Sequence, residues 1–125
     1  MEITFEPKQK YVLVKAKGEI DIQIAKELFI RLLGICAEQK LFRVIVDYRE
    51  VVGFVSIMGR LDYLEGVDAL HKTYLSLNMP KLRIAFVAPS NFITNQAAVL
   101  DQRKALTFDN MATDDIESAE KWVMK

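Results

Sequence analysis

The chain has 125 residues, enough for one domain, and 51% of them are hydrophobic. A domain of this size buries roughly 68% of the surface of its unfolded chain, and the apolar content excludes intrinsic disorder. Seventeen basic residues balance seventeen acidic ones, which argues against nucleic acid or an anionic membrane surface as a partner. We therefore expect a single domain, 1–125, with a core of its own.

The sequence shows no sign of a membrane span, a signal peptide or a disulfide. Its longest stretch without a charge, 84–100, contains polar residues and is shorter than the about 20 apolar residues of a span. The N-terminus lacks a basic start followed by an apolar block. The lone cysteine, Cys36, is expected to be a buried thiol. These features predict a cytoplasmic protein without stable membrane insertion.

The first third of the chain predicts a hairpin and a helix. Two β-rich runs, 3–5 and 11–17, are separated by a short connection and should pair antiparallel. Asp21 is a candidate N-cap for a helix reaching about Gln39, because apolar residues recur there at three- and four-residue steps. Gly34 lies inside this helix, where it costs about 1 kcal/mol relative to alanine. A close approach of the helix to the sheet would account for it.

The remaining chain alternates strands with helices. The run 41–47 is nearly continuously apolar and predicts a central strand that ends at Asp47. Ser56 precedes a second helical pattern, which Asn78-Met79-Pro80 ends. The later predicted elements are a strand at 82–88, a helix at 91–104, a short strand at 106–108 and a last helix capped by Asp114 or Asp115. The order β-β-α-β-α-β-α-β-α predicts an α/β fold whose mostly parallel sheet has one antiparallel edge.

The motifs of common catalytic and cofactor sites are missing. There is no G-x-G-x-x-G and no G-x-x-x-x-G-K-[ST], so a nucleotide cradle is unsupported. With no C-x-x-C and one histidine, His71, the chain has too few donors for a zinc or haem site. Ser56 and His71 would lie about 22 Å apart along one helix, too far for a nucleophile and its base. We expect no catalytic residue, no metal and no cofactor, and a packed histidine.

Several segments carry a resemblance that extends over nearly the whole chain. They are Val46-Asp47-Tyr48-Arg49 with Gly53 and Ser56, then Arg83 to Ala88, and Leu106-Thr107-Phe108-Asp109 with Ala119 and Trp122-Val123. In order and spacing they resemble the STAS-like (SpoIIAA-like) family of small bacterial proteins. The resemblance implies a sheet with helices packed largely on one face. It also implies a fold shared with anti-sigma-factor antagonists and, more distantly, with lipid-binding domains of the Sec14 type.

The resemblance marks Ser56 as a phosphorylation candidate. Antagonists of this family carry an Asp-Ser-Ser-Gly turn at the start of the second helix, and a partner kinase phosphorylates its first serine. Ser56 falls on that serine, but Val55, Ile57 and Met58 replace the other three residues. An ordinary helix N-cap is the simpler interpretation of Ser56.

Further candidates surround this serine. Asp47 would end a parallel strand, where α/β sheets place ligands, or it caps a local turn. Arg60, Asp62 and Tyr63 begin the second helix, where we favour an ordinary exposed surface over the rim of a pocket, because their spacings do not place all three on one face. The uncharged loop 51–55 either folds inward, which we favour, or exposes an apolar patch. The predicted ligand or partner surface consists of Asp47, Phe54, Ser56, Met58, Arg60 and Tyr63.

These observations favour a regulatory or protein-interaction module without enzymatic activity, acting through residues 51–59 and the start of the second helix. Its partner would be another protein or a second copy in a homodimer. The alternative is a protein that binds a small apolar, lipid-like ligand between the helices and the sheet. A weaker alternative is an anti-sigma-factor antagonist controlled by phosphorylation.

Overall fold

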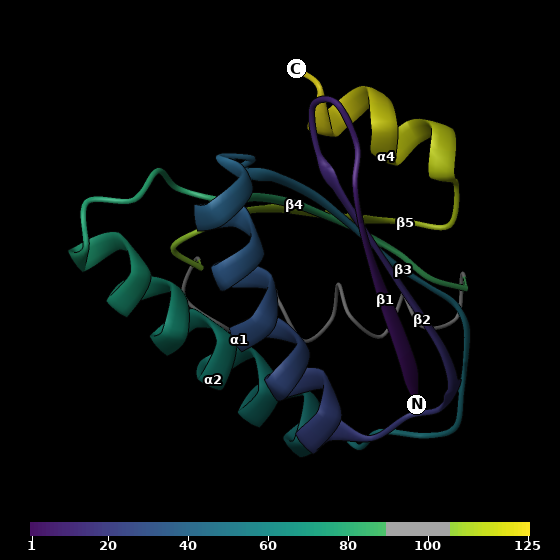
Figure 1. The fold of residues 1–125 in the computed structure, drawn as a ribbon. Coiled ribbons are helices and arrows are strands. Elements are labelled where there is room, and N and C mark those ends of the chain that lie inside the picture. The colour runs from purple at the N-terminus through teal and green to yellow at the C-terminus, as the bar shows by residue number, and fades with distance from the viewer. Residues whose placement is uncertain (90–105) are drawn as a thin grey trace.

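The computed structural model describes residues 1–89 and 106–125, and the predicted helix 91–104 lies outside them. The described residues form five strands and three helices (Figure 1). In chain order these are β1 (Glu2–Pro7), β2 (Val12–Glu19), α1 (Ile22–Gln39), β3 (Arg43–Val52), α2 (Ile57–Ser76), β4 (Arg83–Val87), β5 (Asp109–Thr113) and α4 (Ile116–Val123).

The strands form one sheet in the order β1-β2-β3-β4-β5. β1 pairs antiparallel with β2, and the other neighbouring pairs are parallel. The connection between β1 and β2 is a tight turn, in which the Lys8 N–H donates a hydrogen bond to the Tyr11 carbonyl. The predicted α/β fold, with a mostly parallel sheet and one antiparallel edge, is confirmed.

The helices cover both faces of the sheet unequally. α1 and α2 lie side by side on one face, and α4 lies on the other (Figure 1). From β2 to β5 each strand lies beside the one before it, always in the same direction across the sheet. Right-handed crossovers between strands in such an order place their connecting helices on the same face. The two long helices therefore share a face, as the resemblance implied, and the last helix covers the face that they leave.

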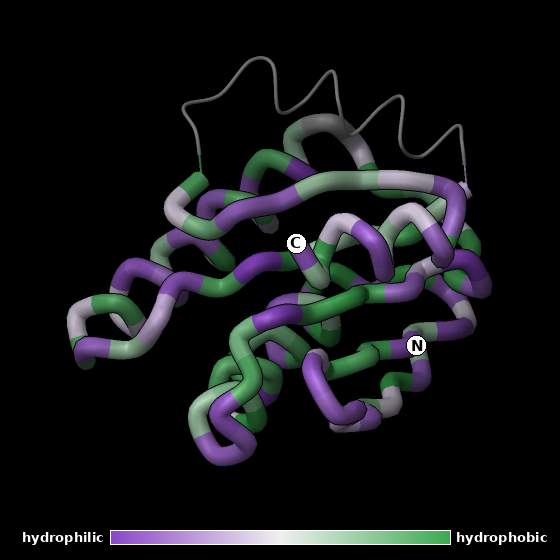
Figure 2. The backbone as a smooth tube through the Cα atoms, turned by 90° about the horizontal axis from the view of Figure 1, so that it is seen from above, coloured by the Kyte–Doolittle hydropathy of each residue, from purple (hydrophilic) through white to green (hydrophobic). Residues whose placement is uncertain are grey.

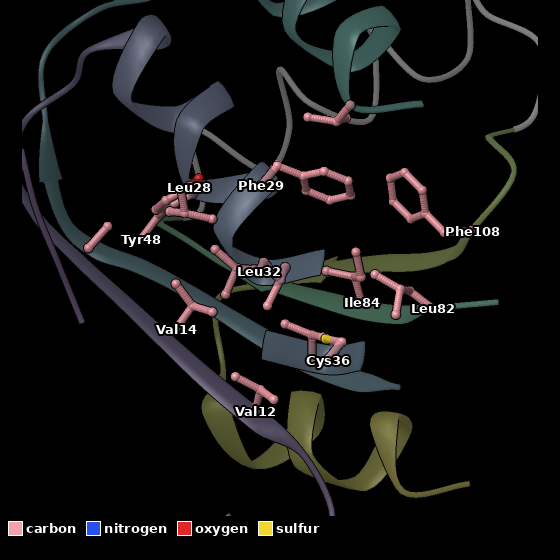
Figure 3. Packing of buried hydrophobic residues seen from close by; sticks show 14 of the residues in the cluster. Val12, Val14, Leu28, Phe29, Leu32, Cys36, Tyr48, Leu82, Ile84 and Phe108 are labelled. Carbon is pink, nitrogen blue, oxygen red and sulfur yellow. The ribbon is translucent and has the colours of Figure 1, made fainter. Parts of the chain in front are cut away.

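The larger core lies between the sheet and the pair α1 and α2. In Figure 3 the Phe29 and Phe108 rings face each other beside the aliphatic side chains of α1 and the central strands; their centroids are 6.0 Å apart. Cys36 is fully buried there, and burial raises the pKa of its thiol to about 12, so it is an inert thiol as predicted. The second core, under α4, contains Ile45, Ala85, Val87, Ala119 and Val123.

Two predicted boundaries are wrong. The last strand runs over Asp109–Thr113 rather than 106–108, because Thr107 is hydrogen-bonded to Asp68 of α2 before the chain enters the sheet. The central strand does not end at Asp47 but continues to Val52, because β2 continues beside it as far as the Glu19–Val52 pair.

No described helix is long and apolar enough to cross a membrane. Figure 2 shows why: hydrophobic and hydrophilic residues alternate along the tube instead of gathering in one long block. This is the pattern of elements that bury one face and expose the other.

Candidate functional site

The junction between β3 and α2 holds most of the predicted surface. Gly53 makes the turn with a φ of 110°, in the left-handed region that favours glycine. A Cβ there would lie 2.9 Å from Cγ2 of Ile20, so the two chain segments approach closely. The turn directs the next residue, Phe54, away from the core.

Three large apolar side chains of this junction are exposed. Phe54 is 86% exposed, Met58 68% and Val52 62%. We call Val52, Phe54 and Met58 the apolar patch. The favoured expectation that this loop folds inward is wrong for Val52 and Phe54, while Val51 and Val55 are half-buried. The patch spans the junction, because Val52 ends β3, Phe54 follows the turn at Gly53 and Met58 lies in the first turn of α2.

Ser56 ends this loop as the N-cap of α2. Its Oγ accepts a hydrogen bond of 3.0 Å from the Gly59 N–H, and the residue is exposed. The simpler interpretation, an ordinary N-cap, is confirmed. The hydroxyl satisfies one of the free N–H groups at the start of the helix.

A groove adjoins the patch, between the loop, α2 and the ends of β2, β3 and β4, and Val52 and Phe54 of the patch help to line it. It has a volume of about 320 Å³ and adjoins a smaller cavity of about 40 Å³. The two spaces share five lining residues: Ile20, Tyr48, Val55, Arg60 and Ala88. The larger volume is at the lower end of the range of ligand pockets, about 300–1,000 Å³.

Two tyrosines from different elements meet at the smaller cavity. Tyr48 of β3 is only 7% exposed, and Tyr63 of α2 is half-buried. The Tyr48 hydroxyl has no hydrogen-bond partner among the described residues, although the two phenols are near enough to influence each other's pKa. Burial, and after it the proximity of Tyr63, raises the pKa of Tyr48 well above its ordinary value.

Arg60 lines both spaces and is 9% exposed. The favoured interpretation, that it belongs to an ordinary exposed helix surface, is therefore wrong for Arg60, because the first turn of α2 directs this side chain toward the sheet. Burial lowers the pKa of its guanidinium, but an arginine remains charged in proteins. The groove thus combines apolar walls with one buried cation.

Asp47 lies apart from these residues. Its side chain shares a face with Ile45, the face covered by α4, whereas Tyr48 faces α1 and α2. Asp47 accepts hydrogen bonds from the backbone N–H, Nε and Nη2 of Arg49, at 3.0, 3.0 and 2.8 Å. Burial raises the pKa of Asp47, but the hydrogen bonds and charge of Arg49 outweigh it, and the net shift is downward.

The role of Asp47 is local. The register between β2 and β3 shifts by one residue between the pairs Lys15–Asp47 and Lys17–Glu50. The Asp47 carboxylate accepts a hydrogen bond from the Arg49 N–H at this shift, which is the local turn-capping role that is the alternative to a ligand site.

His71 is fully buried and packed, as predicted. Its Nε2 accepts a hydrogen bond from the Leu82 N–H at 3.2 Å, so Nδ1 carries the proton of the neutral ring and donates to Thr107 Oγ1 at 2.8 Å. The Thr107 hydroxyl in turn donates to Asp68 at 2.7 Å. Within the described residues, no group of three or more histidine, cysteine, aspartate or glutamate side chains could hold a metal ion.

Sequence reasoning missed Tyr48 as a site residue. A signal was present, since Val44, Val46 and Tyr48 follow the alternation of one strand face, and Tyr48 comes last. A tyrosine at the carboxyl end of a buried strand brings a hydroxyl to the edge of the core. Because the predicted strand ends at Asp47, however, Tyr48 falls outside it, and the alternation no longer marks Tyr48 as a residue of the core face.

At the level of sequence, no family model and no curated protein matches the chain. Solved structures do match it. The anti-sigma factor antagonist SpoIIAA, in its unphosphorylated form, has a TM-score of 0.56 and 11% identity, over 96% of this chain and 95% of that one. A variant of RsbS from Moorella thermoacetica has a TM-score of 0.57 and 11% identity over the whole of both chains.

The chain has the SpoIIAA-like fold. An uncharacterised DUF3478-family protein from Shewanella loihica PV-4, described as having this fold, also matches, with a TM-score of 0.55 and 18% identity over 98% of this chain and 92% of that one. The fold expected from the resemblance is confirmed. Identities of 11–18% show a common architecture and leave function to be argued from the site.

Proposed function

We propose that the chain is a regulatory module without enzymatic activity that binds a protein partner through the apolar patch. The exposure of Phe54 carries this proposal, because an aromatic side chain 86% exposed on a loop is typical of an interaction anchor. Val52 and Met58 extend the same surface within seven residues of chain. SpoIIAA, which has the same fold, is an anti-sigma factor antagonist, and this supports a regulatory role.

The rim of the patch indicates the chemistry of the partner. Glu19 pairs with Val52 in the sheet register, and Asp62 follows Met58 by one helical turn; both are exposed. Between residues 50 and 65 the single basic residue is Arg60, which is buried. A partner surface with an apolar centre and basic residues around it would complement this arrangement.

A pair of matched substitutions tests the proposal. Phe54→Asp and Leu77→Asp each place a carboxylate on an exposed apolar position, since Leu77 is 69% exposed at the far end of α2. A photo-crosslinking residue at position 54 in the native host first identifies the partner. Phe54→Asp should then weaken binding of the purified partner by roughly thirtyfold or more, and Leu77→Asp by less than about twofold. Neither should change the free energy of unfolding by more than about 0.5 kcal/mol.

Equal binding by the two variants would contradict the proposal. Crosslinks that join only two copies of this chain would also contradict it, because the patch would then be the interface of a homodimer. Weaker association at higher salt, lost when Glu19 and Asp62 are neutralised, would support the basic rim.

A second candidate function, binding of a small apolar ligand, is favoured by the groove. The space between the two long helices and the sheet is filled by fully buried side chains such as Leu32, Val44 and Ile84. A ligand would therefore lie in the groove at the end of the sheet. The groove's volume of about 320 Å³ suits a compact molecule rather than a lipid with two acyl chains.

A further inference from the structure

We infer that the groove binds a monocarboxylate with a short apolar tail, its carboxylate lying against the Tyr48 hydroxyl and the Arg60 guanidinium. This inference rests on the second candidate function, small-ligand binding, and names the class of ligand. Three features of the groove support it: an unpaired donor, a buried cation and apolar walls.

The Tyr48 hydroxyl supplies the donor. It is buried, it lacks a hydrogen-bond partner among the described residues, and its side chain lines both the groove and the smaller cavity. Proteins rarely leave a buried polar group unpaired. A tyrosine phenol is protonated at neutral pH, and the raised pKa strengthens this preference, so the hydroxyl can donate a hydrogen bond. An acceptor on a ligand would satisfy it.

Arg60 makes a negatively charged acceptor the favoured one. The guanidinium has five N–H donors, so it can bind an acceptor in the groove in addition to its other interactions. It is nine-tenths buried, and a charge shielded from water attracts an anion more strongly than the same charge on the surface. A carboxylate has the planar pair of oxygens that a guanidinium and a hydroxyl can bind together.

The remaining walls require an apolar body. Ile20, Val55 and Ala88 line both spaces, and Phe86 and Ala112 line the smaller one. A volume of about 320 Å³ limits the ligand to a compact chain. Linear acids from hexanoate to decanoate therefore serve as probes of the groove.

The test is a chemical-shift titration of the isotope-labelled full chain with hexanoate, octanoate and decanoate, and with 1-octanol and octylamine as head-group controls. We expect saturable shifts of the backbone amides of Val55 and Arg60. At least one acid should bind about tenfold or more tightly than octanol. Octylamine should bind more weakly still, because its cation would lie beside Arg60.

Two matched variants locate the head group. Tyr48→Phe removes only the hydroxyl and should weaken binding of the acid about tenfold, while octanol binding changes less than about twofold. Tyr74→Phe removes another buried hydroxyl that is unpaired among the described residues but does not line the groove, and it should leave both affinities unchanged. A purely structural effect of losing a buried hydroxyl would appear in both variants alike.

The outcomes separate the two claims. If the acids and octanol bind equally and Tyr48→Phe changes neither, the carboxylate inference fails and small-ligand binding stands. If no probe shifts the groove amides, both fail. If acids bind but the shifts lie elsewhere in the chain, the site is misplaced and the inference is overturned.

Discussion

Ser56 illustrates how a single side chain can serve two incompatible interpretations. Its hydroxyl caps α2, and the same exposed hydroxyl would accept the phosphate in a phosphorylation-controlled antagonist. The free N–H groups and dipole of the helix N-terminus favour a negative charge at this position. The bound Gly59 N–H shows that capping is its role in the unmodified chain, so phosphorylation stays a prediction.

Substitutions of Ser56 can separate capping from phosphorylation. Ser56→Ala should lower the free energy of unfolding by about 1 kcal/mol, because it removes the cap, whereas Ser56→Asp should preserve it, because aspartate caps equally well. Urea unfolding of the three proteins measures this. Ser56→Asp then serves as a stable mimic of the phosphorylated form. If it binds the partner as tightly as the unmodified chain does, phosphorylation control is ruled out.

At the scale of elements, α1 contains a glycine that its packing does not require. Nothing lies within 4 Å of a Cβ built on Gly34, and the residue is exposed. The close approach to the sheet that would have accounted for it is therefore absent at this position. α1 buries its opposite side, through Ala25, Leu28, Phe29, Leu32 and Cys36.

Gly34→Ala should therefore stabilise the protein. Gly34 does not have a positive φ, which would favour glycine. On an exposed helix face, alanine is more stable than glycine by about 1 kcal/mol. We expect a higher urea midpoint with an unchanged slope of the unfolding transition. A lower midpoint would show that this face of α1 contacts something that the described residues do not include.

At the scale of the whole molecule, the chain of hydrogen bonds through His71 joins three distant segments. It connects α2 to Thr107, just before β5, and to Leu82, just before β4. Burial lowers the pKa of His71; the charge of Lys81 also lowers it, and that of Asp68 opposes the shift. A protonated ring would point an Nε2–H at the Leu82 N–H and lose this bond.

This network predicts that stability depends on pH. The unfolded chain takes up a proton on the histidine near its ordinary pKa of about 6.5, whereas the folded chain resists it. Neutral His71 therefore makes its full contribution to the free energy of unfolding above that pH. This contribution declines as the pH falls toward the lowered pKa of the folded state. Urea unfolding at pH 7.5 and 5.5 should show the loss. His71→Leu, which removes the only histidine, should be less stable at pH 7.5 but nearly insensitive to this change. Equal losses in both proteins would contradict the assignment.

Local patterns in the sequence determined the elements and their order. The apolar period of α1, the N-cap residues Asp21 and Ser56, and the β-branched runs are properties of neighbouring residues, so the α/β fold and its parallel sheet could be predicted without coordinates. Three residues of the predicted surface, Phe54, Ser56 and Met58, lie together at the β3–α2 junction because they are close in sequence; that they bind a ligand or partner stays a prediction.

What the tertiary structure decided depends on which face of the sheet each residue occupies. One position along a strand moves a side chain to the opposite face, so Asp47 and Tyr48, neighbours in sequence, lie on different sides of the molecule. The extension of β3 to Val52 depends on its pairing with β2, which no local pattern reports. For the same reason the groove, which both Tyr48 of β3 and Arg60 of α2 line, exists only where the segments around it have packed together.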